Sequence, residues 1–254
     1  MRRKSGELGM ARRGLMVLVC ALFCSLVQAG EVATTPSVIH LASEDWEDYT
    51  AADGHGLGWD VLRQVFEPAG VKLDIRTGPY LRSLGLAERG EVDACVGSYR
   101  DQSEGVLYPH WNFDTDHIYA LGLASRPVPT PETLGNYRLA WVRGYDYQNY
   151  LPNVQHFAEV QRRDGIVSML SHNRVDFYID ALTEVDYVLN RAKDPSQFRR
   201  TQIAELPLYL CFAKTAKARS LMALFDQRME QLVKSGELKP IFERWKQPYP
   251  FDSN

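Results

Sequence analysis

Aromatic, charged and hydroxyl side chains follow three apolar segments in the first hundred residues, at 38–42, 71–75 and 93–97. Side chains of these types can stack on a small molecule, hydrogen-bond its polar groups and pair with its charges. Because the carboxyl ends of parallel strands meet at one edge of a sheet, we expect the candidate binding residues to gather there. Six candidates come from these segments: Trp46, Tyr49, Tyr80, Arg82, Ser98 and Arg100.

Further candidates follow two apolar segments in the second half, at 139–142 and 175–180. Gly144 and Tyr145 come after the first, where the sequence indicates the start of a helix, whose free N–H groups would suit an anion. Asp180 ends the second. Any one of these residues has an ordinary structural explanation, since a loop aromatic often belongs to the core and an arginine often lies in solvent. Their joint placement at strand ends favours a binding site.

Motifs of catalysis and metal binding are not found in the sequence. It contains no G-x-S-x-G elbow, no H-E-x-x-H, no phosphate loop and no paired-cysteine metal motif. His110 and His117 are the closest histidines, and they lack a third ligand at metal spacing. We therefore expect no enzyme activity, no cofactor and no metal.

The elements that position these residues alternate between strands and helices. Helical spacing of apolar residues predicts a helix that ends near Pro68 and a second one that begins at Pro79, with Leu81 and Leu84 facing inward. Strands are predicted at the three apolar segments. This order indicates an α/β lobe with a largely parallel sheet.

A similar phrase recurs in the second half, because Val92-Asp93 and Val175-Asp176 each follow a predicted helix and open a strand. Aligning them puts Gly97 and Asp180 at the carboxyl ends of strands in two separate sheets. Extended segments at 117–125 and 206–214 flank this second copy. The sequence therefore predicts a signal peptide (1–29), a first lobe (30–126 and 206–254) and a second, inserted lobe (127–205).

The first 29 residues indicate export. Five basic residues precede 14 mostly apolar ones, and Val27-Gln28-Ala29 matches a signal-peptidase site, so we expect cleavage after Ala29. A membrane anchor would need about 20 apolar residues. Valine and phenylalanine precede Cys20 and Cys24, which argues against lipidation. Met10 is an alternative start codon.

The composition of the processed chain argues against nucleic acid as a partner and does not decide whether its two cysteines are bonded. Without the first 29 residues the net charge is −7, so nucleic acid is an unexpected partner. Cys95 and Cys211 remain after cleavage. An oxidising compartment permits a disulfide between them, but both lie in apolar runs, which favours buried free thiols slightly.

The mature chain resembles the bacterial extracellular solute-binding proteins of family 3, the periplasmic receptors of ABC transporters for polar amino acids. The resemblance rests on the order of several phrases: 46–50 with 56–62, Pro-Tyr-Leu-Arg-Ser-Leu at 79–84, Gly-Glu-Val-Asp-Ala at 90–94, Tyr-Pro at 108–109, Arg-Gly-Tyr at 143–145, and Arg-Val-Asp at 174–176 with Asp180.

This resemblance implies a two-lobed periplasmic-binding-protein type II fold, with the lobes joined by two hinge strands. It implies a periplasmic monomer that closes on a small polar solute and delivers it to an ABC permease. In such receptors an arginine binds the ligand carboxylate and an acid binds its ammonium. By position these are Arg100 and Asp180.

Two departures from the family pattern affect this clamp. Gly97-Ser98-Tyr99 precede Arg100, where the family places Thr or Ser three residues before the arginine, and Tyr145 stands where Ser or Thr is usual. The ligand therefore stays open between an amino acid and another small polar solute. Two other functions also stay open: a cleft enzyme of dehydratase type, with Asp180 or Glu44 as the acid, and a soluble sensory module.

Overall fold

The computed structural model describes residues 36–252. The predicted signal peptide, its cleavage site and the alternative start codon lie outside the described residues. Within 36–252, no helix is long and apolar enough to cross a membrane.

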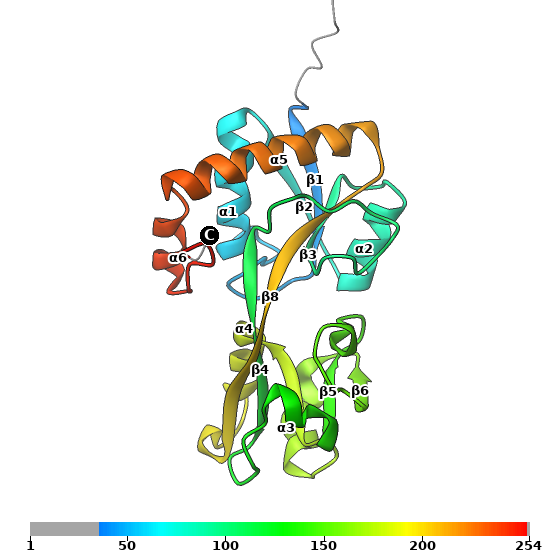
Figure 1. Cartoon of the computed structure of the whole chain (residues 1–254), viewed down its shortest axis with the longest axis vertical. Helices are drawn as coiled ribbons and strands as arrows, with labels where there is room; N and C mark the ends of the chain where they lie inside the picture. Colours follow the sequence, from blue (N-terminus) through cyan, green and yellow to red (C-terminus); the bar gives the residue numbers. More distant parts are fainter. Residues whose placement is uncertain (1–35, 253–254) are drawn as a thin grey trace, which may run out of the picture. The chain divides into compact units, whose positions relative to one another are not determined.

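The first lobe is built on three parallel strands in the order β2, β1, β3 (Figure 1). The predicted strand and helix order is confirmed here, since two helices alternate with these strands. The elements are β1 (Val38–Ser43), α1 (Leu57–Phe66), β2 (Lys72–Thr77), α2 (Tyr80–Glu88) and β3 (Ala94–Ser98). One detail is wrong: Leu81 does not face inward but is 45% exposed.

Two C-terminal helices return to the first lobe, as the apolar spacing predicted. They are α5 (Ala216–Ser235) and α6 (Lys239–Trp245). The α5 helix packs against α1, where the rings of Phe66 and Phe225 lie 6.1 Å apart and both are fully buried. Thr215 caps α5 by accepting a hydrogen bond from the N–H of Ala218 at 3.1 Å.

The second lobe has a parallel arrangement of its own, in which β5 pairs with β6 and β7. Its elements are β5 (Arg138–Val142), β6 (His156–Val160), α3 (Ile166–Ser171), β7 (Phe177–Ala181) and α4 (Leu182–Leu189). The sequence did not indicate β6 or α4. Most of β6 is exposed and lacks an apolar pattern, and α4 follows β7 directly, with no glycine or proline to mark its start.

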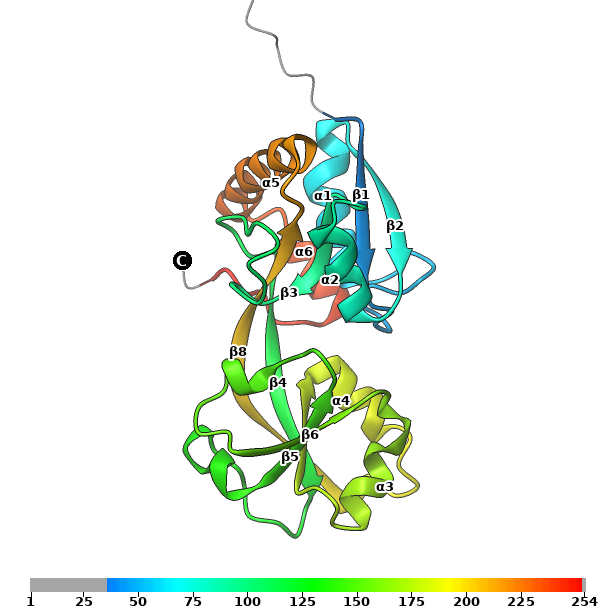
Figure 2. The ribbon, with the colours of Figure 1, turned by 90° about the vertical axis from the view of Figure 1, so that its right-hand side faces the viewer.

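Two long antiparallel strands connect the lobes (Figure 2). They are β4 (Asp114–Leu123) and β8 (Phe198–Phe212). Because β8 also pairs with β3, all strands form one eight-stranded sheet in the order β2-β1-β3-β8-β4-β7-β5-β6. Each lobe thus has its own set of paired strands, and β8 joins the two sets, since its residues 198–208 pair with β4 and its residues 209–212 pair with β3.

Five short 3-10 helices complete the described elements: η1 (Glu67–Ala69), η2 (Pro131–Asn136), η3 (Tyr147–Asn149), η4 (Arg163–Gly165) and η5 (Pro195–Gln197).

Cys95 and Cys211 form a disulfide between β3 and β8. The antiparallel register places the two residues directly opposite each other, with their Cα atoms 5.0 Å apart and both side chains fully buried. The preference for free thiols is therefore corrected. The reason is the pairing of two strands that are 116 residues apart in sequence, which apolar composition alone does not reveal.

Candidate ligand-binding cavity

A cavity of about 470 Å³ is lined by both lobes and by the connecting strand β4. It has the size of a small-molecule site. Five of the nine residues predicted for binding line it: Trp46, Tyr49, Tyr80, Tyr145 and Asp180. Gly97 lines it as well, so the two aligned strand ends, at Gly97 and Asp180, meet at one cavity.

Arg82 and Ser98 do not line the cavity. Arg82 is exposed on α2. Ser98 is fully buried, and its hydroxyl lies 3.1 Å from the side-chain oxygen of Gln102 and 3.1 Å from the hydroxyl of Tyr108. Ser98 therefore orients Gln102, which does line the cavity, and is not itself one of the lining residues.

Arg100 is also away from the cavity. Its Nη2 donates to the carbonyl oxygens of Pro109 and His110 at 2.8 and 3.1 Å, and its guanidinium lies 4.3 Å from the centre of the Tyr209 ring. The segment after Arg100 folds back on it, so that the carbonyl oxygens of Pro109 and His110 accept hydrogen bonds from the guanidinium. The assignment of Arg100 to a ligand carboxylate therefore has no geometric support.

Gly144 does not begin a helix with a free N-terminus. Its φ is 90° and that of Asp146 is 54°, and such left-handed residues interrupt a right-handed helix. Only the three-residue η3 follows. Gly144 instead contacts the first lobe, because its carbonyl accepts from Nε2 of Gln102 at 3.0 Å and a Cβ on it would lie 2.5 Å from Leu81.

Aromatic side chains of the two lobes meet at the cavity. Nε1 of Trp46 donates to the hydroxyl of Tyr145 at 2.8 Å, and the Tyr80 and Tyr145 rings lie 6.1 Å apart in a T-shaped pair. The hydroxyls of Tyr99 and Tyr147 are 3.4 Å apart. These contacts join the lobes with rings that can also stack on a ligand.

Arg163 of η4 is the central cation beside the cavity, and the sequence did not single it out. Its side chain is only 11% exposed. It contacts three carboxylates, at 3.3 Å for Glu44, 3.1 Å for Asp180 and 2.9 Å for Glu184, and it donates to the hydroxyl of Tyr145 at 2.6 Å. Burial opposes its charge, but these carboxylates, Asp180 foremost, raise the pKa of Arg163 above its usual value.

Asp180 is fully engaged within the protein. Besides Arg163 it accepts hydrogen bonds from the hydroxyl of Tyr178, from the backbone N–H of Ala181 at 2.9 Å and from the hydroxyl of Tyr147 at 3.5 Å. It is 1% exposed. Its carboxylate is thus a structural anchor for Arg163 at the cavity wall.

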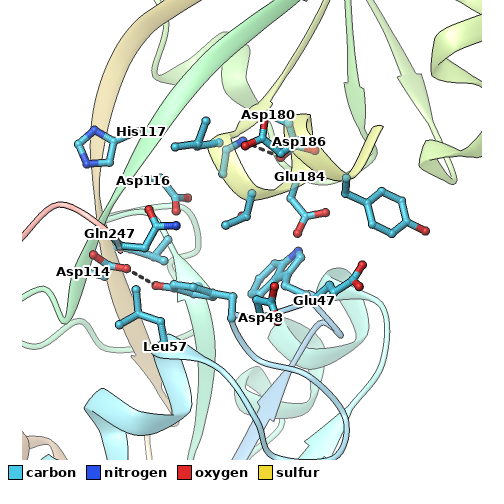
Figure 3. A pocket seen from close by; sticks show the side chains of 18 of the residues that line it. Glu47, Asp48, Leu57, Asp114, Asp116, His117, Asp180, Glu184, Asp186 and Gln247 are labelled. Atoms are coloured by element: carbon cyan, nitrogen blue, oxygen red, sulfur yellow. Dashed lines mark hydrogen bonds between the residues drawn. The ribbon is translucent and has the colours of Figure 1, made fainter. Parts of the chain in front are cut away.

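Three other carboxylates, those of Asp114, Asp116 and Glu184, also line the cavity (Figure 3). Asp114 accepts from the hydroxyl of Tyr49 at 2.7 Å, and Asp116 accepts from that of Tyr99 at 2.9 Å. Burial raises the pKa of Asp114 and of Asp116 to about 7. Burial likewise raises the pKa of Glu184 to about 8, against the opposing effect of Arg163.

Asp116, Glu184 and Arg163 had no recognisable signal in the sequence. Asp116 lies inside a strand, and Glu184 lies in a helix that was not predicted. Within residues 36–252, no group of three or more histidine, cysteine or acidic side chains is arranged to hold a metal ion.

No protein-family model and no curated protein matches this chain. Solved structures are similar to it in fold. The substrate-binding protein of an amino acid ABC transporter matches with a TM-score of 0.63 and 17% identity, over 82% of this chain and 98% of that one. A histidine kinase sensor domain similar to periplasmic binding proteins matches with a TM-score of 0.64 and 16% identity, over 83% of this chain and 96% of that one.

A third structure, an ancestral amino acid-binding protein described as a precursor of cyclohexadienyl dehydratase, matches with a TM-score of 0.63 and 14% identity, over 82% of this chain and 95% of that one. At these identities the comparisons establish the fold. It is the two-lobed α/β fold of periplasmic binding proteins, with two connecting strands, as the sequence indicated.

Proposed function

We propose that this protein is a periplasmic solute-binding receptor that captures a small polar molecule between its two lobes for ABC-type transport. The observation that carries this proposal is the cavity to which both lobes contribute side chains. A ligand that contacts both lobes at once favours the arrangement in which they meet, because those contacts exist only there. The fold shared with substrate-binding proteins supports the same function.

The proposal includes the remaining sequence-based expectations. The chain is exported by residues 1–29, released after Ala29, and acts as a monomer that delivers its solute to a permease. These expectations also include the lobe bounds, 30–126 with 206–254 for the first lobe and 127–205 for the second. Pairing of β4 with β7 at Ile118–Leu121 supports a first crossing earlier than 126.

A thermal-shift screen of the mature protein tests this function. The panel contains amino acids, amines, organic acids and sugars, and we expect at least one solute to raise the melting temperature in a concentration-dependent way. Titration calorimetry should then give one site per chain. The absence of any stabilising solute would contradict the proposal.

The position of the binding site has its own test. We expect Tyr80→Ala, which truncates a cavity-lining ring, to reduce the affinity for the identified solute by at least tenfold. Arg100→Ala is the control, because Arg100 contacts loop carbonyls and not the cavity. If Arg100→Ala abolishes binding and Tyr80→Ala does not, the site lies elsewhere.

The enzyme alternative is less well supported by the geometry. Its two candidate acids, Asp180 and Glu44, both contact Arg163 at 3.1 and 3.3 Å, so neither is a free proton donor at the cavity. Mass spectrometry of the bound solute after long incubation distinguishes the two functions. We expect the solute to be recovered unchanged.

A further inference from the structure

The cavity has a strong excess of acidic side chains. Seven carboxylates line it: Glu47, Asp48, Asp114, Asp116, Asp180, Glu184 and Asp186. Among the described residues that line it, two are basic, His117 and Arg191. An anionic group entering this cavity is repelled by each of these carboxylates that is ionised.

Both basic residues have protein partners outside the centre of the cavity. His117 lies 3.3 Å from Glu205, and the exposed Arg191 stacks 3.3 Å from the centre of the Tyr187 ring and donates to the Tyr187 carbonyl at 3.0 Å. The nearby Arg163 already faces three carboxylates. Among residues 36–252, the cavity thus has no buried arginine without carboxylate partners to bind the carboxylate of an α-amino acid.

Two of the acids are poised to receive a cation. Glu184 is 6% exposed, and one of its oxygens lies 2.9 Å from Arg163, while no hydrogen bond from residues 36–252 reaches the other. Among residues 36–252, Asp116 accepts a side-chain hydrogen bond only from the hydroxyl of Tyr99. Figure 3 shows both side chains extending into the same space from β4 and α4.

Aromatic rings line the same space, and they favour positive charge. Eight aromatic residues contribute to the walls: Trp46, Tyr49, Tyr80, Tyr99, Tyr145, Tyr147, Tyr187 and Trp245. Ring faces attract ammonium groups, with a larger effect where water is excluded. Burial raises the pKa of Asp116 and Glu184 because it disfavours their charged forms. A cation bound beside them would stabilise those charged forms.

We infer that the cavity selects an organic amine that carries one or more ammonium groups and no carboxylate. Asp116 and Glu184 bind the ammonium, and the rings pack on its carbon chain. This inference rests on the proposed receptor function and narrows its ligand from polar solutes in general to one chemical class. It departs from the amino-acid clamp expected from Arg100 and Asp180.

Matched pairs of compounds that differ by one carboxylate test the inference. Cadaverine with lysine, putrescine with ornithine, and agmatine with arginine are compared by thermal shift and titration calorimetry on the mature protein. We expect at least one amine to bind more than tenfold tighter than its amino acid. If every amino acid binds as tightly as its amine, or if only anionic or uncharged solutes bind, the inference is overturned while the receptor function stands. If no solute binds at all, both fail.

Charge-neutralising variants then test the two acids. We expect Asp116→Asn and Glu184→Gln each to weaken binding of the tightest amine by at least tenfold. Asp74→Asn is the matched control, because it removes one charge from an exposed carboxylate on β2 that pairs with His40 outside the cavity. Asp116→Asn keeps an acceptor for Tyr99 and so should fold normally. Unchanged amine affinity in both cavity variants would overturn the assignment.

Discussion

Glu44 of the first lobe and Arg163 of the second lobe form an ion pair, with Oε1 and Nη1 3.3 Å apart. Both side chains are largely buried, at 16% and 11% exposure. Glu44 also accepts from the backbone N–H of Tyr80 at 3.1 Å. The pair therefore links the start of α2 in one lobe to the charge network of the other.

Replacing Arg163 should destabilise the protein strongly. Arg163→Ala leaves Glu44, Asp180 and Glu184 without their shared cation, and loss of one partner of a buried ion pair costs about 3–5 kcal/mol. Urea denaturation of the mature protein measures this. Arg244→Ala is the control, since its 63%-exposed side chain pairs with Asp60 and should contribute less than about 1 kcal/mol. Equal losses in both variants would show that the buried network is not stabilising.

The close contact of Trp46 with Gly97 makes a second prediction. Gly97 has a φ of 89°, and a Cβ added to it would lie 2.6 Å from the Trp46 ring. Gly97→Ala should destabilise the protein and displace the indole, which tryptophan fluorescence and urea denaturation both detect. Gly70→Ala is a matched control, because its φ of 80° carries the same backbone cost but a Cβ there meets no atom within 4 Å. We expect the Gly97 variant to lose at least about 1 kcal/mol more, in line with overpacked sites.

The disulfide should contribute measurably to stability. The Cys95–Cys211 bond closes a loop across 116 residues of sequence, and bonds of this kind typically contribute about 2–4 kcal/mol by restricting the unfolded chain. The double variant Cys95→Ala/Cys211→Ala should unfold at a lower urea concentration by that amount. The oxidised protein should show no free thiol under denaturing conditions. A full count of two thiols in protein isolated from an oxidising compartment would contradict the bond.

The stability of the empty protein should depend on pH through the cavity acids. The pKa of Asp116 is raised to about 7, in surroundings that include Tyr99, Asp114 and Asp180. An unfolded aspartate has a pKa near 3.9, so between roughly pH 4 and 7 the folded state holds a proton that the unfolded state has lost. The free energy of unfolding contributed by Asp116 therefore falls as pH rises through this window and is constant above it.

Asp116→Asn removes this contribution. We expect its melting temperature to decline less between pH 5 and 8 than that of the unchanged protein, and to be higher at pH 8. Asp74→Asn, at an exposed carboxylate, serves as the control. Identical pH profiles for Asp116→Asn and the unchanged protein would show that Asp116 titrates normally.

Much of the fold could be predicted from the sequence, because its signals are local. The apolar spacing of α5, Pro79 before α2 and the alternation of β2 each depend on a few neighbouring residues. The recurring Val-Asp phrase, the extended segments that flank its second copy and the family resemblance then indicated the two-lobed α/β arrangement. β6 and α4 were missed because an exposed strand and an unpunctuated helix start lack such signals.

The site was predictable only in part. The strand ends brought Trp46, Tyr49 and Asp180 to the cavity, as the sheet-edge rule requires. Which charges remained free was not predictable. Arg100 and Asp180 carry opposite charges at plausible positions. Arg100, however, donates to loop carbonyls, and Asp180 pairs with Arg163.

The sequence by itself predicted the export signal. It also determined the alternation of strands and helices and the strand ends that carry aromatic side chains. The tertiary structure decided the pairing of Cys95 with Cys211 and the convergence of Glu44, Asp180 and Glu184 on Arg163. The physical reason is that charge pairing depends on distances between residues far apart in the chain. Those distances are set by the antiparallel strands β4 and β8, which connect the two lobes. The same arrangement leaves Asp116 at the cavity among aromatic rings.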